Sequence, residues 1–424
     1  MAIKGKKVLI AQNPLSRSAT SRHSPPTAFA KAPAVKKGER EKVLIALSGG
    51  IDSAVSAYLL VKKGYQVEAA FMKNWSSTEG LLKNECPWLV DRQDALRVAP
   101  FLRIPLHTLD FEKQYQKNVM EYFFNEYKKG RTPNPDVMCN KEIKFKLLYN
   151  WAMKNGFDYL ATGHYARIKF QTSQNHGRDL SKYTLSRSAD EFKDQTYFIY
   201  NIQTEQLPHI LFPIGGMKKT AVRTLARELK LPNAEKKESM GLCFVGKIRL
   251  KDFLEQRLKP KAGPIVFMQS SIPSSVVQMH SRHLPPKGEG GDTVLGQHQG
   301  LYNYTIGQRQ GIKVGGGGPY YVVKKDLKTN TLYVTNNPDD ENLLTREIQI
   351  HSINWISPGY QLKTINYKLT GRYRHQGELV PLTIKQIKKD LYSVTFVKPQ
   401  KAVASGQSLV LYKGKECLGG GVIV

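Results

Sequence analysis

Cysteine is scarce in this chain. Its 424 residues include four cysteines, Cys86, Cys139, Cys243 and Cys417, with no Cys-x-x-Cys pair and no histidines at the spacing of zinc ligands. This pattern argues against a disulfide framework and a structural metal site, and it favours a reducing compartment. If a cysteine is functional here, we expect it to be catalytic.

Long apolar runs and acidic residues are also few. No run approaches the roughly 18 residues of a membrane-spanning helix, so we expect no membrane segment. The 64 Lys and Arg outnumber the 35 Asp and Glu, which gives a formal net charge of +29. Such a charge favours a polyanionic partner, usually nucleic acid, although a lysine-rich surface common to a whole proteome is the alternative. The length leaves room for two or three domains.

Residues 1–40 differ in composition from the rest of the chain. They are basic and contain no Asp or Glu before Glu39, so we expect a disordered basic extension. The same composition is typical of an organellar transit peptide and of an RNA-binding arm, and it could also reflect the choice of start site. We expect a cytoplasmic protein, with the mitochondrial matrix as the alternative.

A strand, a glycine turn and a helix follow this segment. Residues 43–47 are all apolar, as in a strand buried on both faces, and residues 55–62 show helical periodicity. Between them lies Ser48-Gly49-Gly50-Ile51-Asp52-Ser53. The glycines permit a sharp turn and close approach, the amides at the helix start suit phosphate, and Asp52 suits a magnesium ion bridging phosphates. No Gly-Lys-Ser/Thr follows, so this is not a Walker loop. We predict a nucleotide site, with an ordinary strand–turn–helix corner as the alternative.

Strands and helices then alternate along the chain. We predict strands at residues 66–71, 106–111 and 158–162, and helices at 91–102, 112–129 and 141–155. This order predicts an α/β fold with a doubly wound parallel sheet, in which ligands bind beyond the carboxyl ends of the strands. The loops that start at Ser48, Met72 and Gly163 leave that edge, so we expect them to meet at one site.

Cys139 lies in the proline-containing block 130–145. We expect a helix to start near it, capped by Asp136 or Asn140. A cysteine at a helix start beside Lys141 and Lys144 should have a lowered pKa and thiolate character. The alternative is a buried structural cysteine.

Cys243 lies in a second cysteine-containing stretch. Gly241 and Gly246 flank it and lysines stand on both sides, which predicts a mobile cationic loop. Cys417 falls in an apolar C-terminal stretch, where we expect a core strand.

The C-terminal part reads differently. Short alternating runs from Tyr320 onward predict a small β-barrel, and residues 371–375 are expected to give it a basic and aromatic face for RNA. Residues 270–291 look like an insertion or a loose loop. The glycine run 315–318 lacks the strand-to-helix context of a nucleotide loop. We predict a catalytic domain at 41–248, a small central domain at 249–325 and the barrel at 326–424.

These stretches together resemble the tRNA-specific 2-thiouridylases of the PP-loop ATP pyrophosphatase superfamily (adenine-nucleotide α-hydrolase-like fold). The resemblance runs from about Lys42 to Val424. It rests on residues 47–53, 71–75, 130–145, 161–167, 193–198, 238–244, 305–309, 406–407 and 417–421.

The resemblance implies an enzyme, a sulfurtransferase that uses ATP and Mg²⁺. It would adenylate the oxygen on carbon 2 of the wobble uridine and then replace it with persulfide sulfur. By position, ATP would be bound by Ala46, Leu47, Ser48, Gly49, Gly50, Ile51, Asp52, Ser53, Met72 and Gly163. Cys139 would be the nucleophile, Cys243 the persulfide carrier and Asp136 a candidate general acid or base, with a transient disulfide between the cysteines. The tRNA would contact Asn134, Pro135, Asp136, His164, Lys193, Asp194, Gln195, Arg372, Tyr373 and Gln407.

The partners implied are tRNAs for lysine, glutamate and glutamine and a persulfide donor or carrier protein, with the enzyme a monomer. Two other functions remain open. A PP-loop ligase or amidotransferase of the argininosuccinate or GMP synthetase kind would not need the cysteine pair. A non-catalytic, ATP-dependent RNA-binding protein would release no pyrophosphate.

Overall fold

Strand β1 (Lys42–Ala46) lies in the middle of a parallel five-stranded sheet in the computed structural model, with the strand order β3-β2-β1-β4-β9. Its neighbours are β2 (Gln66–Lys73) and β4 (Tyr159–Ala161), and β3 (Leu106–Asp110) and β9 (Ile210–Leu211) form the edges. The structure describes residues 40–76, 87–172, 174–175, 178–179, 182–237, 250–268, 293–312, 314, 319–356 and 367–424.

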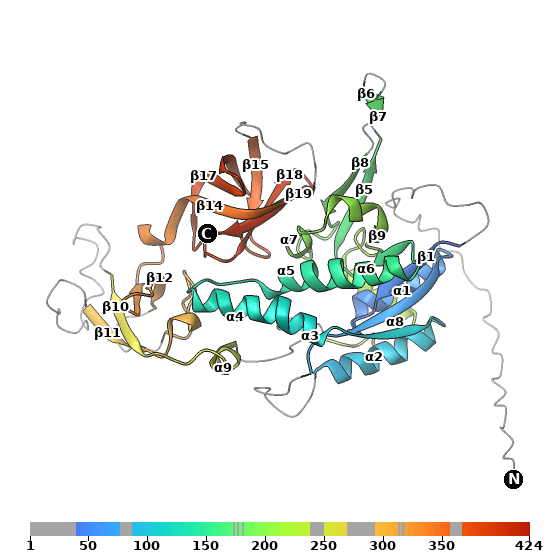
Figure 1. Cartoon of the computed structure of the whole chain (residues 1–424), viewed down its shortest axis with the longest axis horizontal. Coiled ribbons are helices and arrows are strands. Elements are labelled where there is room, and N and C mark those ends of the chain that lie inside the picture. Colours follow the sequence, from blue (N-terminus) through green and yellow to red (C-terminus); the bar gives the residue numbers. More distant parts are fainter. Residues whose placement is uncertain are drawn as a thin grey trace, which may run out of the picture.

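Different helices cover the two faces of this sheet (Figure 1). Val43 and Ile45 pack on one side in a cluster that includes residues of α1 (Ile51–Lys62), α2 (Pro87–Phe101) and α8 (Lys219–Glu228). Leu44 and Ala46 point the other way and pack with the helices between residues 112 and 154. Since successive side chains of a strand alternate between faces, β1 is buried on both sides. The predicted doubly wound α/β sheet is confirmed.

Two long helices cover the second face of the sheet, on the side of Leu44 and Ala46. The first consists of α3 (Glu112–Tyr115), the π-helical η1 (Gln116–Met120) and α4 (Glu121–Lys128), and the second of α5 (Pro135–Cys139), η2 (Asn140–Leu148) and α6 (Tyr149–Lys154). The second helix starts at Pro135, earlier than predicted, and the predicted caps Asp136 and Asn140 were wrong. The cap is Asn134, whose side-chain oxygen accepts hydrogen bonds from the backbone N–H groups of Asp136 and Val137 at 3.1 and 3.2 Å. Proline suits the first helical position because its φ is preset and its missing N–H is not needed there. Cys139 therefore lies in the second turn of the helix, not at its start.

Six antiparallel strands close into the predicted barrel at the C-terminus. Their order is β14-β17-β16-β15-β18-β19, and an additional pairing of β14 with β19 closes the ring. The strands are β14 (Leu344–Trp355), β15 (Tyr367–Arg372), β16 (Val380–Lys388), β17 (Leu391–Lys401), β18 (Ser408–Lys413) and β19 (Glu416–Ile423). Cys417 is completely buried in β19, as expected, and burial raises the pKa of its thiol.

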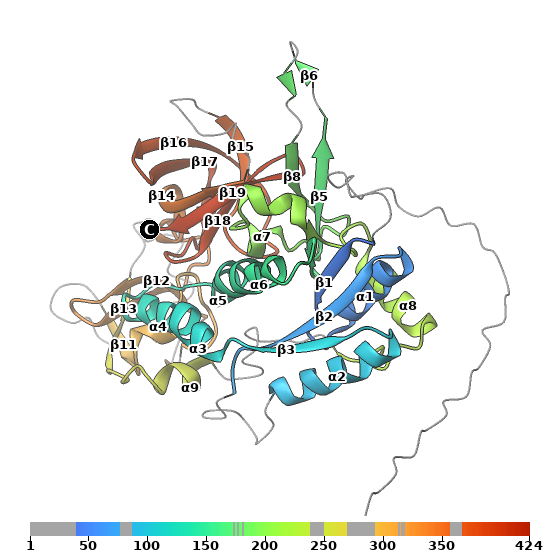
Figure 2. The same ribbon diagram turned by 45° about the vertical axis from the view of Figure 1, so that its right-hand side comes forward.

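The barrel is continuous with strands of the first domain. Strand β19 also pairs with β8 (Lys182–Arg187), which pairs with β5 (Ala166–Gln171). These two strands project from the body of the protein, with β6 (Gln174–Asn175) and β7 (Arg178–Asp179) at the tip (Figure 2). The sequence did not predict this hairpin.

A smaller four-stranded sheet lies between these two parts in the sequence. Its order is β11-β10-β13-β12, from β10 (Gly263–Phe267), β11 (Thr293–His298), β12 (Tyr321–Asp326) and β13 (Thr331–Thr335). The predicted boundary between residues 325 and 326 falls inside β12, so strand pairing favours a boundary after Thr335. The remaining helical segments are α7 (Thr196–Ile199), η3 (Thr204–His209), α9 (Leu250–Glu255), η5 (Leu301–Asn303) and η6 (Glu341–Leu343).

Several predicted features lie outside the described residues: the extension up to residue 39, the loop of Cys243, and the segments 270–291 and 315–318. Within the described residues, no helix has the length and hydrophobicity needed to cross a membrane.

A buried ion pair network joins the barrel to the first domain. The carboxylate of Asp194, fully buried, lies 3.3 Å from Nε of Arg187 on β8 and 3.0 Å from Nη1 of Arg372 on β15. The hydroxyl of Thr196 donates to the same carboxylate at 3.0 Å and lies 3.0 Å from the hydroxyl of Tyr412 on β18. Because each charge here is desolvated, removal of one partner leaves another buried and unpaired.

We therefore expect Asp194→Ala to lower the free energy of unfolding by about 3–5 kcal/mol, the usual cost of breaking a buried pair. The measurement is urea unfolding followed by circular dichroism. Asp339→Ala is the control, since Asp339 is 87% exposed where it pairs with Lys401 at 3.3 Å, and exposed pairs contribute little. Equal urea midpoints for the two variants would contradict the role assigned to the network.

Candidate functional site

The loop between β1 and α1 is held in shape by its own serines. The Ser53 hydroxyl donates to the carbonyl oxygen of Gly50 at 2.9 Å and accepts from the backbone N–H of Ser48 at 3.2 Å. Gly50 has an extended backbone and no side chain within the described residues caps the first turn of α1. The N–H groups of that turn thus point out of the helix end, as an anion site requires.

Residues outside the loop contact the turn at Gly49 and fix its position. Its φ is +75°, and a Cβ at this position would lie 2.2 Å from the carbonyl oxygen of Asp91, so only glycine fits. The Gly49 carbonyl oxygen accepts from Asn233 Nδ2 at 2.9 Å and from Lys236 Nζ at 3.3 Å. Lys236 also pairs with Asp91 and Asp94 at 2.7 and 2.5 Å. Burial lowers the pKa of Lys236, but these hydrogen bonds outweigh it and the pKa is raised, so Lys236 stays charged.

Asp52 is engaged by two residues that sequence reasoning missed. Both of its carboxylate oxygens accept from Lys219 Nζ, at 2.8 and 2.7 Å, and one also accepts from the Tyr165 hydroxyl at 2.9 Å. Lys219 is the first residue of α8 and its side chain is only 12% exposed. The sequence did contain one indication of Lys219. The pair Gly215-Gly216 shortly precedes this lysine at the start of a helix, just as Gly49-Gly50 precede the helix that contains Asp52.

The three predicted loops do meet at one edge of the sheet. A Cβ on Gly163 would lie 2.8 Å from the backbone nitrogen of Ser53, so the loop after β4 touches the start of α1. The backbone N–H of Leu47 donates to the carbonyl oxygen of Ala70 at 2.9 Å, and Met72 lies two residues further along β2 on the same edge. Of the residues expected to bind ATP, Ala46, Leu47, Ile51 and Met72 have buried side chains.

The two central residues of the cysteine block differ in exposure. Asp136 is half-buried in the first turn of α5, whereas Cys139 is completely buried in the core cluster that contains Ala46 and Met72. The expectation that Cys139 starts a helix is wrong, because Asn134 caps the helix earlier. Cys243 lies outside the described residues, so the distance between the two sulfurs is not part of this geometry.

His164 lies beside this helix as a buried, neutral side chain. Its Nδ1 lies 2.7 Å from the Thr162 hydroxyl, and its ring lies 5.9 Å from that of Phe145 and 6.0 Å from that of Phe212. Burial and, secondarily, the charge of Lys144 hold the pKa of His164 well below its ordinary value. Contact of His164 with tRNA stays a prediction.

The other residues expected to contact tRNA gather where the barrel meets the first domain. Gln195 accepts from the backbone N–H of Tyr165 at 2.9 Å, and Gln407 donates to the carbonyl oxygen of Thr132 at 2.7 Å. Asp194 and Arg372 pair with each other, while Lys193 is half-buried. Their positions are compatible with a domain junction, and contact with tRNA remains a prediction for each.

The expected basic and aromatic face at residues 371–375 was wrong for Arg372 and Tyr373. Both are buried, Arg372 by its pairing with Asp194 and Tyr373 by packing against Phe396 in the barrel core, with ring centroids 6.0 Å apart. Arg374 is the exposed residue of this stretch.

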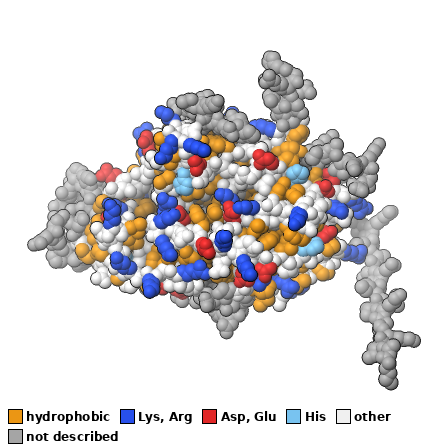
Figure 3. All heavy atoms as spheres, viewed as in Figure 1, with side chains coloured by type: hydrophobic (Ala, Val, Ile, Leu, Met, Phe, Trp, Pro, Cys, Tyr) orange, Lys and Arg blue, Asp and Glu red, His pale blue; other side chains and the backbone are white. Residues whose placement is uncertain are grey.

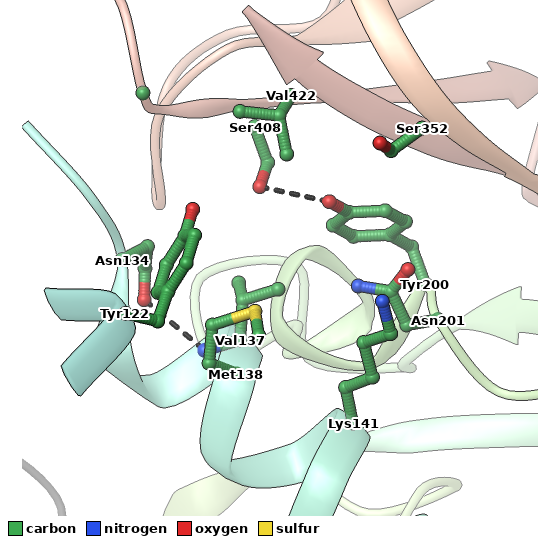
Figure 4. A pocket seen from close by; sticks show the side chains of 11 residues that line it. Tyr122, Asn134, Val137, Met138, Lys141, Tyr200, Asn201, Ser352, Ser408 and Val422 are labelled. Atoms are coloured by element: carbon green, nitrogen blue, oxygen red, sulfur yellow. Dashed lines mark hydrogen bonds between the residues drawn. The ribbon is translucent and has the colours of Figure 1, made fainter. Parts of the chain in front are cut away.

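A small pocket opens between helix α5 and the barrel (Figure 4). Asn134 and Met138 form one side, Tyr200 and Ser408 another, and Lys141 stands at the edge. The complete lining is Tyr122, Asn134, Val137, Met138, Lys141, Tyr200, Asn201, Ser352, Gly406, Ser408 and Val422. Asn134, expected to meet the target base, therefore faces a concave surface with both polar and aromatic walls.

One face of the molecule shows the positive charge seen in the sequence. Lys and Arg side chains are spread across the face shown in Figure 3 and are more frequent there than Asp and Glu. No group of three or more His, Cys, Asp or Glu side chains that could hold a metal occurs in the part of the chain that the structure describes.

A buried parallel strand, a glycine loop and an uncapped helix, joined to a β-barrel, define a PP-loop α/β protein of the adenine-nucleotide α-hydrolase-like class. Three family profiles match: one described as tRNA methyl transferase HUP domain at residues 41–247, a tRNA methyl transferase PRC-barrel domain at 251–336 and an aminomethyltransferase beta-barrel domain at 345–423. The chain is 40% identical over 399 residues to the tRNA-specific 2-thiouridylase MnmA of Flavobacterium johnsoniae, covering 90% of this chain and 100% of that protein. It is also 40% identical to the enzyme of the same name from Bacillus velezensis, covering 92% and 96%. The chain belongs to the family of tRNA-specific 2-thiouridylases.

Two solved structures show a distant likeness. One is a 4-thiouridine synthetase–RNA complex with bound ATP, with 19% identity, 51% of this chain and 50% of that chain covered, and a TM-score of 0.32. The other is the NMN synthetase of Francisella tularensis, with 19% identity, 51% and 72% covered, and a TM-score of 0.31. Similarity at this level adds nothing to the assignment.

The contact between Gly163 and the start of α1 yields a prediction. Gly163→Ala should weaken ATP binding by about tenfold or more, because the new Cβ would meet backbone atoms of Asp52 and Ser53 at 2.9 and 2.8 Å and displace the helix start. Equilibrium dialysis with ATP measures the effect. Gly216→Ala is the matched control, since a Cβ there meets nothing within 4 Å. Unchanged ATP affinity in Gly163→Ala would show that the helix start does not hold the nucleotide.

Proposed function

We propose that this protein replaces the oxygen on carbon 2 of the wobble uridine of tRNA with sulfur, and that it spends ATP to do so. The observation that carries the proposal is the uncapped start of α1 behind the glycine loop, in a chain that belongs to the tRNA-specific 2-thiouridylase family. The named relatives act on tRNA, and the net charge of +29 suits such a polyanion.

The first step of the proposed reaction activates the base. The uridine oxygen attacks the α-phosphorus of ATP, pyrophosphate leaves, and the base carries an adenylate. Backbone N–H groups of Gly50, Ile51 and Asp52 and the hydroxyls of Ser48 and Ser53 would hold the phosphates, with Met72 and Gly163 beside the adenosine. Lys219 is placed to move from Asp52 to a phosphate oxygen, where its charge would offset the negative charge that develops.

The second step needs sulfur and two thiols. We propose that Cys243 carries a persulfide and that the Cys139 thiolate attacks the inner sulfur. A Cys139–Cys243 disulfide forms and hydrosulfide is released. The hydrosulfide attacks carbon 2, and AMP leaves with the former uridine oxygen. A thiol reductant then restores both cysteines. Because Cys139 is completely buried, water would be excluded from this step. Asp136 is the candidate acid or base.

Magnesium was expected near Asp52, bound together with ATP and not fixed by the protein. No group of three or more His, Cys, Asp or Glu side chains surrounds Asp52 among the described residues, and Mg²⁺ prefers several oxygen ligands, so these residues do not fit a site that holds magnesium without the nucleotide. We propose that any magnesium enters with the phosphates of the nucleotide.

Partners and location complete the proposal. We propose tRNAs for lysine, glutamate and glutamine as substrates, a persulfide carrier protein as donor, and a monomeric enzyme. Because the relatives named above are bacterial, we propose a cytoplasmic location, with the mitochondrial matrix as the alternative if residues 1–40 are a transit peptide. We also propose three domains, with the predicted first boundary between residues 248 and 249 and with the second boundary after Thr335 in place of the predicted one between 325 and 326, because β12 spans the latter and pairs with β13.

The two steps can be separated by cysteine variants. Cys139→Ser and Cys243→Ser should retain release of pyrophosphate on a single turnover with unmodified tRNA and ATP, because neither thiol takes part in adenylation. Both should lose formation of 2-thiouridine when a persulfide donor is added, as measured by mass analysis of nucleosides. Cys417→Ser is the control, since Cys417 is buried in the barrel and should keep both activities if it folds.

Three outcomes would contradict the proposal. Thiolation that persists in Cys139→Ser would remove the nucleophile role. Pyrophosphate release by wild type without any thiolation would favour a PP-loop ligase. Tight tRNA binding with neither reaction would favour a non-catalytic RNA-binding protein.

A further inference from the structure

One aromatic side chain is far more exposed than the rest. Phe192 is 86% exposed, the highest value among the large hydrophobic residues that the structure describes, and Val397 follows at 58%. Phe192 lies in the turn between β8 and α7, directly before Lys193, and no residue role assigned so far includes it. A ring of this size in water has an unfavourable hydration free energy, so covering it with another flat apolar surface would be favourable.

The backbone that carries Phe192 is fixed on both sides. The backbone N–H of Lys193 donates to Asp190 Oδ1 at 3.2 Å, and the other carboxylate oxygen of Asp190 accepts from the backbone N–H of Lys219 at 2.9 Å. On the other side lies the buried carboxylate of Asp194. From the barrel, Gln376 Nε2 donates to the carbonyl oxygen of Phe192 at 3.5 Å. The ring is therefore presented from a rigid turn, and ordering it on binding would cost little conformational entropy.

The surroundings of the ring are polar and mainly cationic. Arg374 is exposed next to the Gln376 contact, and its guanidinium lies 5.4 Å from the ring centre of Tyr373. The acidic neighbours are Asp190, whose two carboxylate oxygens accept from backbone N–H groups, and Glu191, which lies 3.9 Å from Lys415 and 3.8 Å from Arg187. A docking surface for a protein or a membrane is usually a contiguous apolar patch, which a lone ring among charges is not. A planar ring flanked by cations instead matches an unpaired nucleic-acid base and its phosphates.

We propose that Phe192 is a stacking platform for one unpaired base of the RNA substrate, with Lys193 and Arg374 contacting the neighbouring phosphates. This inference rests on the proposed function, because it takes the substrate to be a tRNA whose target uridine lies in a single-stranded loop. The turn joins the first domain to the barrel junction, so a base held there would fix the loop relative to both.

The test is binding of an anticodon stem-loop RNA to the full-length protein, measured by fluorescence anisotropy over a range of salt concentrations. Phe192→Ala should weaken binding by about 5- to 150-fold, the usual effect of losing one base–aromatic stack. Phe192→Trp should bind as tightly as wild type or more tightly. Val397→Ala is the control, since Val397 is also an exposed apolar residue but lies on β17 and carries no ring on which a base could stack, and it should bind as wild type does.

Salt dependence separates stacking from charge. Phe192→Ala should leave the slope of log affinity against log salt unchanged, because no phosphate contact is lost. Arg374→Ala should reduce its magnitude by about 0.7, the value for one phosphate contact on a single strand. At saturating tRNA, Phe192→Ala should thiolate at the wild-type rate, with only KM raised.

A duplex of the same sequence supplies a further arm, since its bases are not free to stack on the ring. Phe192→Ala and wild type should bind this duplex equally.

Equal affinities of Phe192→Ala and wild type for the stem-loop would overturn the inference and leave the proposed function intact. Wild-type protein that binds no tRNA would overturn the proposed function and the inference with it. A loss of affinity that is the same for duplex and stem-loop would also overturn the stacking role.

Discussion

The site depends on a close approach between backbones at the start of α1. Gly49 has no room for a side chain against Asp91, and Gly163 has none against Asp52 and Ser53. These contacts bring the ends of β1 and β4 and the start of α2 around one helix end, where backbone N–H groups gather positive partial charge. Side chains then stabilise the arrangement. Lys236 donates a hydrogen bond to the carbonyl oxygen of Gly49, and Lys219 donates to the carboxylate of Asp52.

The second constraint is the buried carboxylate of Asp194. It binds one arginine from the hairpin next to the parallel sheet and one from the barrel, so the two parts share a desolvated ion pair. The turn at Gly406 adds to this junction, since Thr132 donates to the carbonyl oxygen of Ser405 at 2.8 Å and Gln407 donates back to Thr132. Thr132 lies just before the helix of Cys139. The barrel thus positions the segment that precedes the helix of Cys139, the proposed nucleophile. The pocket at Asn134 lies along the same junction.

Much of this could be predicted from local pattern. The apolar run at residues 43–47, the hexapeptide after it and the alternation of strands and helices identified the sheet, the loop and the edge where they meet. The start of the Cys139 helix was predicted wrongly because Asn134, Asp136 and Asn140 are all residue types that commonly cap helices. Only the folded structure shows that Asn134 is the cap. Tertiary contacts decided the remaining differences. The motif around Lys193 and the residues from Gly371 look like solvated, basic surface in the sequence, yet Asp194 and Arg372 neutralise each other in the interior. Lys219 and Lys236 act on residues more than 160 positions away, a relation that a single sequence does not display.

The central claim is that the base oxygen itself is activated by adenylation. It is tested most directly with tRNA whose uridines carry a heavy oxygen isotope on carbon 2, incubated with the protein, unlabelled ATP and a persulfide donor. Mass analysis of the released AMP then reports where the oxygen goes. The account predicts one heavy oxygen in AMP for each 2-thiouridine formed, because the adenylated oxygen leaves with the nucleotide. Thiouridine formed together with unlabelled AMP would contradict it.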